Sequence, residues 1–200
     1  MRPTFFYRAF GVLMALVIVA GLSGCGINTL PRLDEQVKAS WSQVLNQYKR
    51  RADLVPNLVA TVKGYAQHER DVLISVTQAR AQVGSLKIPD NITENPAAFK
   101  KFQNAQANLT GALSRLLVVA ERYPQLKANQ NFLTLQAQLE GTENRISVAR
   151  RDYIQAVQKY NTELRTIPGR WYASLFYPDA EVKQNFTISK EEMQTPKVQF

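Results

Sequence analysis

Apolar side chains recur at steps of three and four residues along three long stretches of the chain. The first stretch, Leu33 to Val83, has seven-residue gaps where charged or polar residues interrupt the row, and it contains Val37, Trp41, Val44, Tyr48, Val55, Val59, Val62, Ala66, Leu73, Val76 and Val83. This spacing is typical of an amphipathic helix that packs against other helices. A single helix of that length would measure on the order of 80 Å, so the pattern predicts an elongated rod.

Pro56 interrupts this first stretch, and an interior proline removes one backbone hydrogen bond and clashes with the carbonyl of Ala52. The preceding Arg51–Val55 segment offers only Asp53 as a turn residue, and the apolar row keeps its phase across the proline. We therefore expect one continuous helix with a kink at Pro56; a clean break there is the alternative.

Two more helices and a short fourth one are expected downstream. The second runs from Pro96 to Tyr123 behind an Asn95 cap, and the third extends from Phe132 to Leu164 before Pro168 and Gly169 stop it. An aromatic cluster at residues 171–177 predicts a short helix or cap at one end. No pair of β-type segments competes, so the fold class is an all-α, elongated antiparallel bundle of three main helices plus a short C-terminal helix.

The amino terminus has the organisation of an export signal. Two arginines precede an apolar run from Phe10 to Leu22, and small residues stand directly before Cys25, the single cysteine. The four residues Leu22, Ser23, Gly24 and Cys25 resemble a bacterial lipobox. In the proteins it resembles, the signal is removed before the cysteine, which then carries diacylglycerol and usually a further acyl chain such as palmitate.

Cys25 is therefore expected to be a lipid anchor, because several acyl chains give stable membrane attachment. The alternative keeps residues 5–22 as an uncleaved membrane helix. Both interpretations place the rest of the chain outside the cytoplasm, since Arg2 and Arg8 hold the amino terminus inside. Gly26 stands where lipoproteins retained in the inner membrane often carry Asp, which favours the outer membrane.

These signals divide the chain into four parts: a signal peptide at residues 1–24, a lipidated tether at 25–30, a helical bundle at 31–180 and an irregular tail at 181–200. The stretch from Met193 to Phe200 is expected to be loose or to lie over the surface.

The net charge of +9 favours anionic partners in general. The basic residues are spread along the chain, and no aromatic-rich basic cluster accompanies the largest doublets, so nucleic-acid binding is not expected. His68 is the single histidine and there is no glycine-rich phosphate loop, so neither a metal site nor a cofactor is expected.

Four charged residues fall on or beside the apolar rows: Arg51, Glu69, Glu143 and Arg150. Buried acids need partners, and either arginine could provide one. These residues could form a polar layer that sets helix register, a functional groove, or merely the solvent edge of the stripe.

Several long sequence segments resemble those of the LemA family. Three of them resemble the family's opening: Leu33–Val44, Arg50–Val59 and Val62–Tyr65. The other three resemble its most characteristic block: Tyr123–Phe132, Leu139–Ile146 and Ala149–Tyr153. Ile154 departs from the asparagine that many members carry, and the lipobox departs from their membrane helix. The resemblance implies a membrane-attached, elongated helical bundle and supplies no catalytic residues.

The leading hypothesis is a non-enzymatic envelope lipoprotein that acts as an interaction or scaffold module and binds an unidentified envelope protein. The sequence does not determine its oligomeric state. The alternative is a bundle that binds a ligand or lipid along a groove, and an enzyme of unknown class is third. An open apolar groove would favour the alternative, whereas a closed core with a polar patch would favour the interaction module.

Overall fold

The computed structural model describes residues 11, 14 and 26–187. Within this part the chain forms helices α2 (Thr29–Lys63), α3 (Arg70–Gly84), α4 (Pro96–Ala120), α5 (Pro124–Lys127), α6 (Gln130–Arg165) and α7 (Gly169–Phe176), and it contains no strand. The prediction of an all-α elongated bundle is confirmed. The predicted lipobox, Leu22 to Cys25, and the segment Met193 to Phe200 lie outside the described residues.

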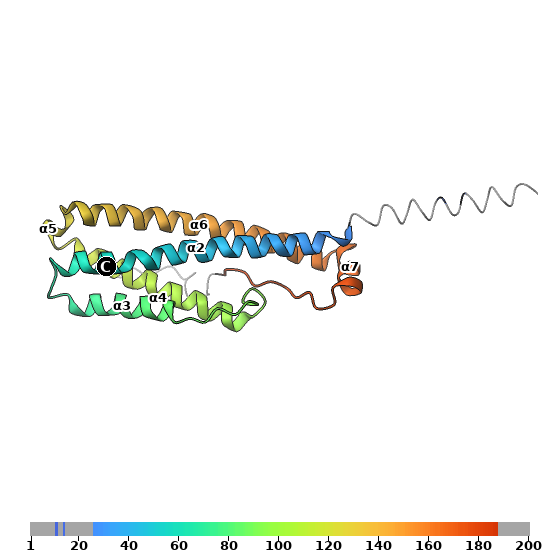
Figure 1. The fold of residues 1–200 in the computed structure, drawn as a ribbon, viewed down its shortest axis with the longest axis horizontal. Helices are drawn as coiled ribbons and strands as arrows, with labels where there is room; N and C mark the ends of the chain where they lie inside the picture. The colour runs from blue at the N-terminus through green and yellow to red at the C-terminus, as the bar shows by residue number, and fades with distance from the viewer. Residues whose placement is uncertain (1–10, 12–13, 15–25, 188–200) are drawn as a thin grey trace, which may run out of the picture.

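Helices α2 and α6 form the long axis of the molecule and lie side by side over most of their 35 and 36 residues (Figure 1). The shorter pair α3 and α4 packs against them at the end where α5 lies, and α7 closes the opposite end (Figure 1). Consecutive long helices run in opposite directions, so the topology is up-down-up-down.

The prediction of one helix from Leu33 to Val83 is wrong, because the chain reverses between α2 and α3 at residues 64–69. The amides of Tyr65 and Ala66 both bond to the carbonyl of Val62, at 3.0 and 2.9 Å, and Ala66 is fully buried under the turn. This turn overlaps the seven-residue gap between Ala66 and Leu73 in the apolar row. The bundle therefore has four main helices instead of three.

Helix α2 continues through Pro56. The proline cannot donate to the carbonyl of Ala52, and that carbonyl instead accepts a hydrogen bond of 3.1 Å from Nε of Arg80 on α3. A side chain from the neighbouring helix thus replaces the bond that the proline removes.

The expected boundaries of the other helices are close to the observed ones. Asn95 caps α4, as predicted, by accepting a 3.0 Å hydrogen bond from the Ala98 amide, and Asn129 caps α6 in the same way through the Phe132 amide. Helix α4 ends at Ala120, three residues before the predicted end at Tyr123, because Pro124 begins the separate single turn α5.

The core consists of two clusters along the rod. The α5-end core is mostly aliphatic and is contributed by α2 to α6; it contains Val55, Leu58, Val62, Ala66, Leu73, Val76, Ala79, Leu109, Ala112, Leu113, Leu116, Ala120, Leu126, Phe132 and Leu139. The α7-end core is rich in aromatic rings and includes Trp41, Tyr48, Phe99, Phe102, Tyr153, Tyr160 and Phe186.

Residues 181–187 pack against the bundle although they form no helix or strand. Lys183 and Phe186 are buried, and the hydroxyl of Tyr153 donates a 2.8 Å hydrogen bond to the carbonyl of Gln184. We call residues 181–187 the strap. It runs back along the α7-end half of the rod (Figure 1), where the short helix α3 does not reach.

Candidate functional site

Arg51 is the largest fully buried side chain in the described part of the bundle, with 1% of its surface exposed. Its Nη2 donates to the carbonyl and to Oε1 of Gln106, at 3.1 and 2.7 Å. Its Nη1 donates to Oγ1 of Thr110 at 2.8 Å and to Oε1 of Glu143 at 3.0 Å. The guanidinium also lies over the ring of Tyr48, 5.0 Å from its centroid.

These contacts join α2, α4 and α6 at one level of the rod, between the two cores. Arg51 stands between Tyr48 of one core and Val55 of the other, and Gln106 stands between Phe102 and Leu109 in the same way. A buried cation with matched acceptors on two neighbouring helices disfavours sliding of those helices, because any shift would leave its charge unpaired. We call Arg51, Gln106, Thr110 and Glu143 the arginine layer.

The structure brings together only part of the four charged residues predicted from the sequence. Arg51 and Glu143 are in contact, whereas Arg150 stands about two helical turns further along α6, over the ring of Phe186 at 4.5 Å from its centroid. Glu69 does not join them. It lies in the α2–α3 turn, where its Oε1 accepts hydrogen bonds from Nη2 of Arg122 at 3.0 Å and from the Tyr123 hydroxyl at 3.1 Å.

Gln106 and Thr110 were not singled out from the sequence. Gln106 carries a usable signal, because it stands four residues after Phe102 and three before Leu109, on the buried side of α4. A glutamine in that row marks a buried polar partner. Thr110 follows four residues later and has no comparable signal.

A second buried cation, Lys183, ties the strap to the bundle. Its Nζ lies 2.6 Å from Oδ1 of Asp34 on α2, bonds to Oε1 of Glu94 before α4, and sits 5.0 Å from the centroid of the Tyr160 ring on α6. Burial would lower the pKa of Lys183, but the two carboxylates outweigh it and the pKa is raised. Burial likewise opposes ionisation of Asp34, but hydrogen bonds from Lys183 and Lys38 hold its pKa below the usual value.

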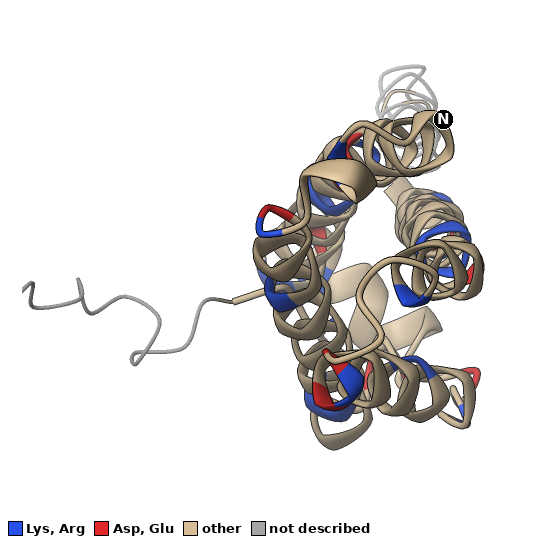
Figure 2. Ribbon diagram, turned by 90° about the vertical axis from the view of Figure 1, so that its left-hand side faces the viewer, with Lys and Arg blue, Asp and Glu red and all other residues tan. Residues whose placement is uncertain are grey.

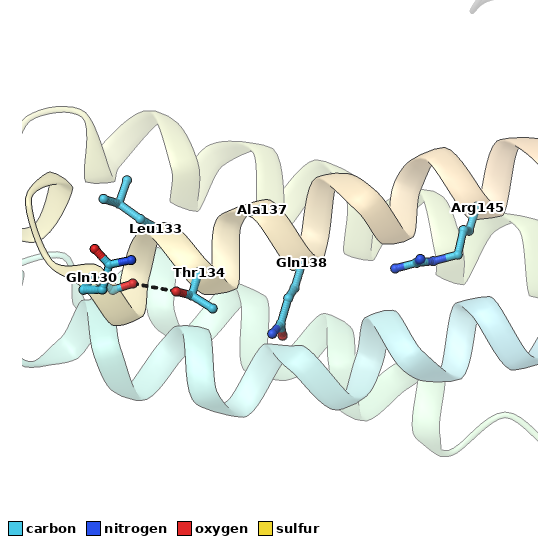
Figure 3. Close-up of a pocket in the computed structure, with 6 residues that line it drawn as sticks. All are labelled: Gln130, Leu133, Thr134, Ala137, Gln138 and Arg145. Atoms are coloured by element: carbon cyan, nitrogen blue, oxygen red, sulfur yellow. Dashed lines mark hydrogen bonds between the residues drawn. The ribbon is translucent and has the colours of Figure 1, made fainter.

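Several grooves that open to solvent lie along the rod. The one in Figure 3, of 470 Å³, follows the face of α6 past Leu133, Gln138 and Arg145, and all six of its lining residues are exposed. Its one marked bond, Oγ1 of Thr134 to the carbonyl of Gln130, lies within α6. A groove of 450 Å³ between α4 and α6 is lined partly by Leu113, Leu117 and Leu139, with Glu143 of the arginine layer at its edge.

Among residues 11, 14 and 26–187, no three His, Cys, Asp or Glu side chains gather as a metal site would require. None of the helices built by these residues is long and apolar enough to cross a membrane. Basic and acidic positions are interspersed around the bundle (Figure 2), so neither sign dominates one side of the rod in this view.

The continuous described stretch begins with Gly26, the residue after Cys25, at the α7 end of the rod. A methyl group added at Gly26 would lie 2.5 Å from Cε2 of Tyr172, so α7 packs on the first residue after the cysteine. The hydroxyl of Tyr177 donates a 3.2 Å hydrogen bond to the carbonyl of Ile27. Any anchor on Cys25 is therefore attached at the same end of the rod as α7.

Together these features define an elongated antiparallel four-helix bundle whose two cores meet at a buried arginine. The chain belongs to the LemA family, whose model matches residues 40–200. It is 24% identical over 162 residues to the magnetosome proteins MamQ 1 and MamQ 2 of Paramagnetospirillum magneticum, an alignment that covers 73% of this chain and 60% of each relative. It is 23% identical over 139 residues to Protein LemA of Metamycoplasma hominis, covering 70% of this chain. The chain thus spans about three fifths of the length of these relatives.

Proposed function

We propose that this protein is a lipid-anchored, non-enzymatic interaction module of the bacterial cell envelope, whose helical rod holds a binding surface away from the membrane. The observation that carries the proposal is the placement of the rod relative to Cys25. Helix α2 begins at Thr29, four residues after the cysteine, so hardly any flexible chain separates the predicted anchor from the bundle.

The length of the rod supports a stand-off role. Thirty-five residues of α2 span about 50 Å at 1.5 Å per residue, and α6 accompanies them along that length. Both cores are filled, which favours a module that acts through its outer surface. Partners would be envelope proteins, and the outer membrane is the favoured location.

Membrane fractionation of the full chain tests the anchor. Cys25→Ala removes the only thiol and should release the protein from membranes, whereas Ser23→Ala keeps the residue before Gly24 small and should leave it attached. Retention of Cys25→Ala in the membrane fraction would refute lipid anchoring. Separation of inner and outer membranes then assigns the location.

In-cell photo-crosslinking tests the interaction role. Crosslinkers at the exposed positions Val118 on α4 and Val148 on α6 should capture a specific envelope protein. The matched control places the same crosslinker at buried Leu116, which should capture nothing. Equal capture from all three positions would contradict a defined binding surface.

One observation favours ligand binding as a second function. The groove between α4 and α6 combines leucine side chains with a carboxylate, Glu143, whose side chain is 40% exposed. A ligand there would carry an apolar chain and a cationic or hydrogen-bonding head. A thermal shift with long-chain amines that disappears in Leu117→Gln would support this function, and the absence of any shift would remove it.

A further inference from the structure

Helix α7 turns an apolar face away from the bundle. Trp171 and Leu175 stand four residues apart on this face and are 63% and 73% exposed, and the adjoining Ile167 and Phe176 are 64% and 48% exposed. We call these four residues the α7 apolar face. Isolated exposed apolar residues are ordinary, but a cluster containing an exposed tryptophan marks a surface that contacts something.

The opposite side of α7 accounts for how the helix is held. Gly169 and Ala173 are buried, and a methyl group at Gly169 would lie 2.2 Å from the carbonyl of Glu163 at the end of α6. The backbone of α7 therefore sits against α6 so closely that only glycine fits. This seating leaves Trp171 and Leu175 pointing outward.

The position of this face indicates what covers it. Through Tyr172 and Tyr177, α7 contacts Gly26 and Ile27, the residues that directly follow Cys25. A diacylglycerol-modified cysteine places its acyl chains in the bilayer, so a helix packed on the next residue is held at the membrane surface. The α7 apolar face is thus the part of the bundle nearest to the lipid.

The residue types also suit a membrane interface. Tryptophan is enriched where acyl chains meet head groups, because its ring is largely apolar and its N–H remains hydrogen-bonded. Leu175 and Phe176 add aliphatic and aromatic surface. Arg165 and Arg170, which are exposed and lie close to Ile167 and Trp171 in the sequence, can meet anionic head groups.

We propose that the α7 apolar face inserts into the leaflet in which Cys25 is anchored, at the level where head groups meet acyl chains, and so orients the rod on the membrane. This inference rests on the proposed lipid anchor. A lipid anchor alone lets a rod tilt freely, whereas a second contact a few residues from the anchor restricts tilt. The arrangement would direct the α5 end away from the membrane.

Tryptophan fluorescence tests the contact, because the chain has only two tryptophans. The full lipidated chain is placed in vesicles of phosphatidylethanolamine and phosphatidylglycerol whose acyl chains are either normal or brominated. In Trp41→Phe, which leaves Trp171 as the emitter, brominated lipid should remove most of the emission. In the matched Trp171→Phe variant, the buried Trp41 should emit almost equally in both vesicles.

Vesicle flotation is measured on the same samples, so failure of the anchor and failure of the α7 contact are distinguishable. A chain that does not float overturns the anchor and the contact together. If the chain floats but Trp171 emission is unchanged by brominated lipid and is quenched by iodide in the water, the α7 contact alone is overturned. Emission insensitive to both quenchers means that a second copy or another protein covers the face, which also overturns lipid contact.

Substitution gives a second measurement that does not depend on the fold of Trp41→Phe. Leu175→Gln in the otherwise native chain should weaken bromine quenching of the total emission while flotation stays complete. Val118→Gln makes a comparable change at an exposed position on α4 and should leave quenching unchanged. Equal quenching in the two variants would contradict insertion of α7.

Discussion

The two halves of the rod reach a closed core by different means. At the α5 end, α2, α3, α4 and α6 enclose mostly valine, leucine and alanine, and every residue except Ala66 of the turn and Leu126 of α5 comes from one of these four helices. At the α7 end, α3 is absent, and large aromatic rings together with Phe186 of the irregular strap fill the space. The first half needs only amphipathic helices, whereas the second depends on a segment that follows the last helix in the chain.

The ring contacts show how the α7-end core compensates for the absence of α3. The centroid of Trp41 lies 5.5 Å from that of Phe99, 5.2 Å from that of Phe102 and 5.3 Å from that of Tyr153. Phe186 approaches Phe99 at 5.1 Å. Aromatic side chains bury the most surface per residue, so few of them replace a missing helix. The arginine layer marks the border between the two constructions.

The largest effect is expected in the α5-end core. Leu116→Ala should lower the free energy of unfolding by about 4 kcal/mol, because a fully buried leucine in a rigid four-helix core leaves a cavity. Chemical denaturation measures the loss. Val118→Ala on the same helix is 68% exposed and should cost little; similar losses in both variants would show that this core is not closed.

The next largest effect is expected at the arginine layer. Arg51→Ala should cost about 3 kcal/mol, at the low end for a broken buried pair because Glu143 can reach water. Glu143→Gln keeps the acceptor oxygen and should cost less. Denaturation monitored separately at Trp41 and at the α5 end tests the border, since two separated transitions in Arg51→Ala would show that the layer couples the halves.

Removing the strap contact should have a smaller and local effect. Phe186→Ala should cost about 2 kcal/mol, less than is usual for a buried phenylalanine, because a non-helical segment can detach without unfolding the helices. Hydrogen exchange should increase at residues 181–187 and around Trp41 while α3 stays protected. Exposed Glu181→Ala is the control, and uniform loss of protection along the rod would contradict a local role.

The bond that compensates Pro56 provides a smaller test. Arg80→Ala should cost about 1 kcal/mol, since it leaves the Ala52 carbonyl without its donor. In a Pro56→Ala background, the amide of residue 56 can donate a hydrogen bond to the Ala52 carbonyl, so Arg80→Ala should hardly change the free energy of unfolding. A double-mutant cycle measures this coupling, and an equal cost in both backgrounds would show that Arg80 does not replace the missing bond.

The smallest effect is the acid sensitivity of the strap. Because the pKa of Asp34 is lowered on folding, its contribution is complete above the unfolded value of about 3.9 and is lost as the pH falls through the lower folded value. Thermal unfolding measured down to that acid range should show the loss. Asp34→Asn should be less stable at neutral pH and show a smaller acid-dependent decrease; an unchanged pH profile would contradict the Lys183 pairing.

Much of the fold could be predicted because the helices are amphipathic and capped by local residues. The apolar rows placed α4 and α6 to within a few residues, and Asn95 marked the start of α4. In the first stretch, the prediction that the helix continues through Pro56 is confirmed, but the same reasoning missed the turn at residues 64–69. The backbone hydrogen bond that Pro56 removes can be replaced by a side-chain donor. Here the donor is Arg80, which is 28 residues away in sequence from Ala52, whose carbonyl accepts the bond.

The sequence by itself therefore determined what depends on near neighbours: helical periodicity, caps, the lipobox-like words and the family. Tertiary structure decided what depends on distant ones. Arg51 and Glu143 are 92 residues apart, and Lys183 and Glu94 are 89 apart, so no local pattern specifies either pair. The same holds for α7, whose amphipathic sequence does not reveal that Tyr172 packs on Gly26, because that contact forms only when the whole rod has folded.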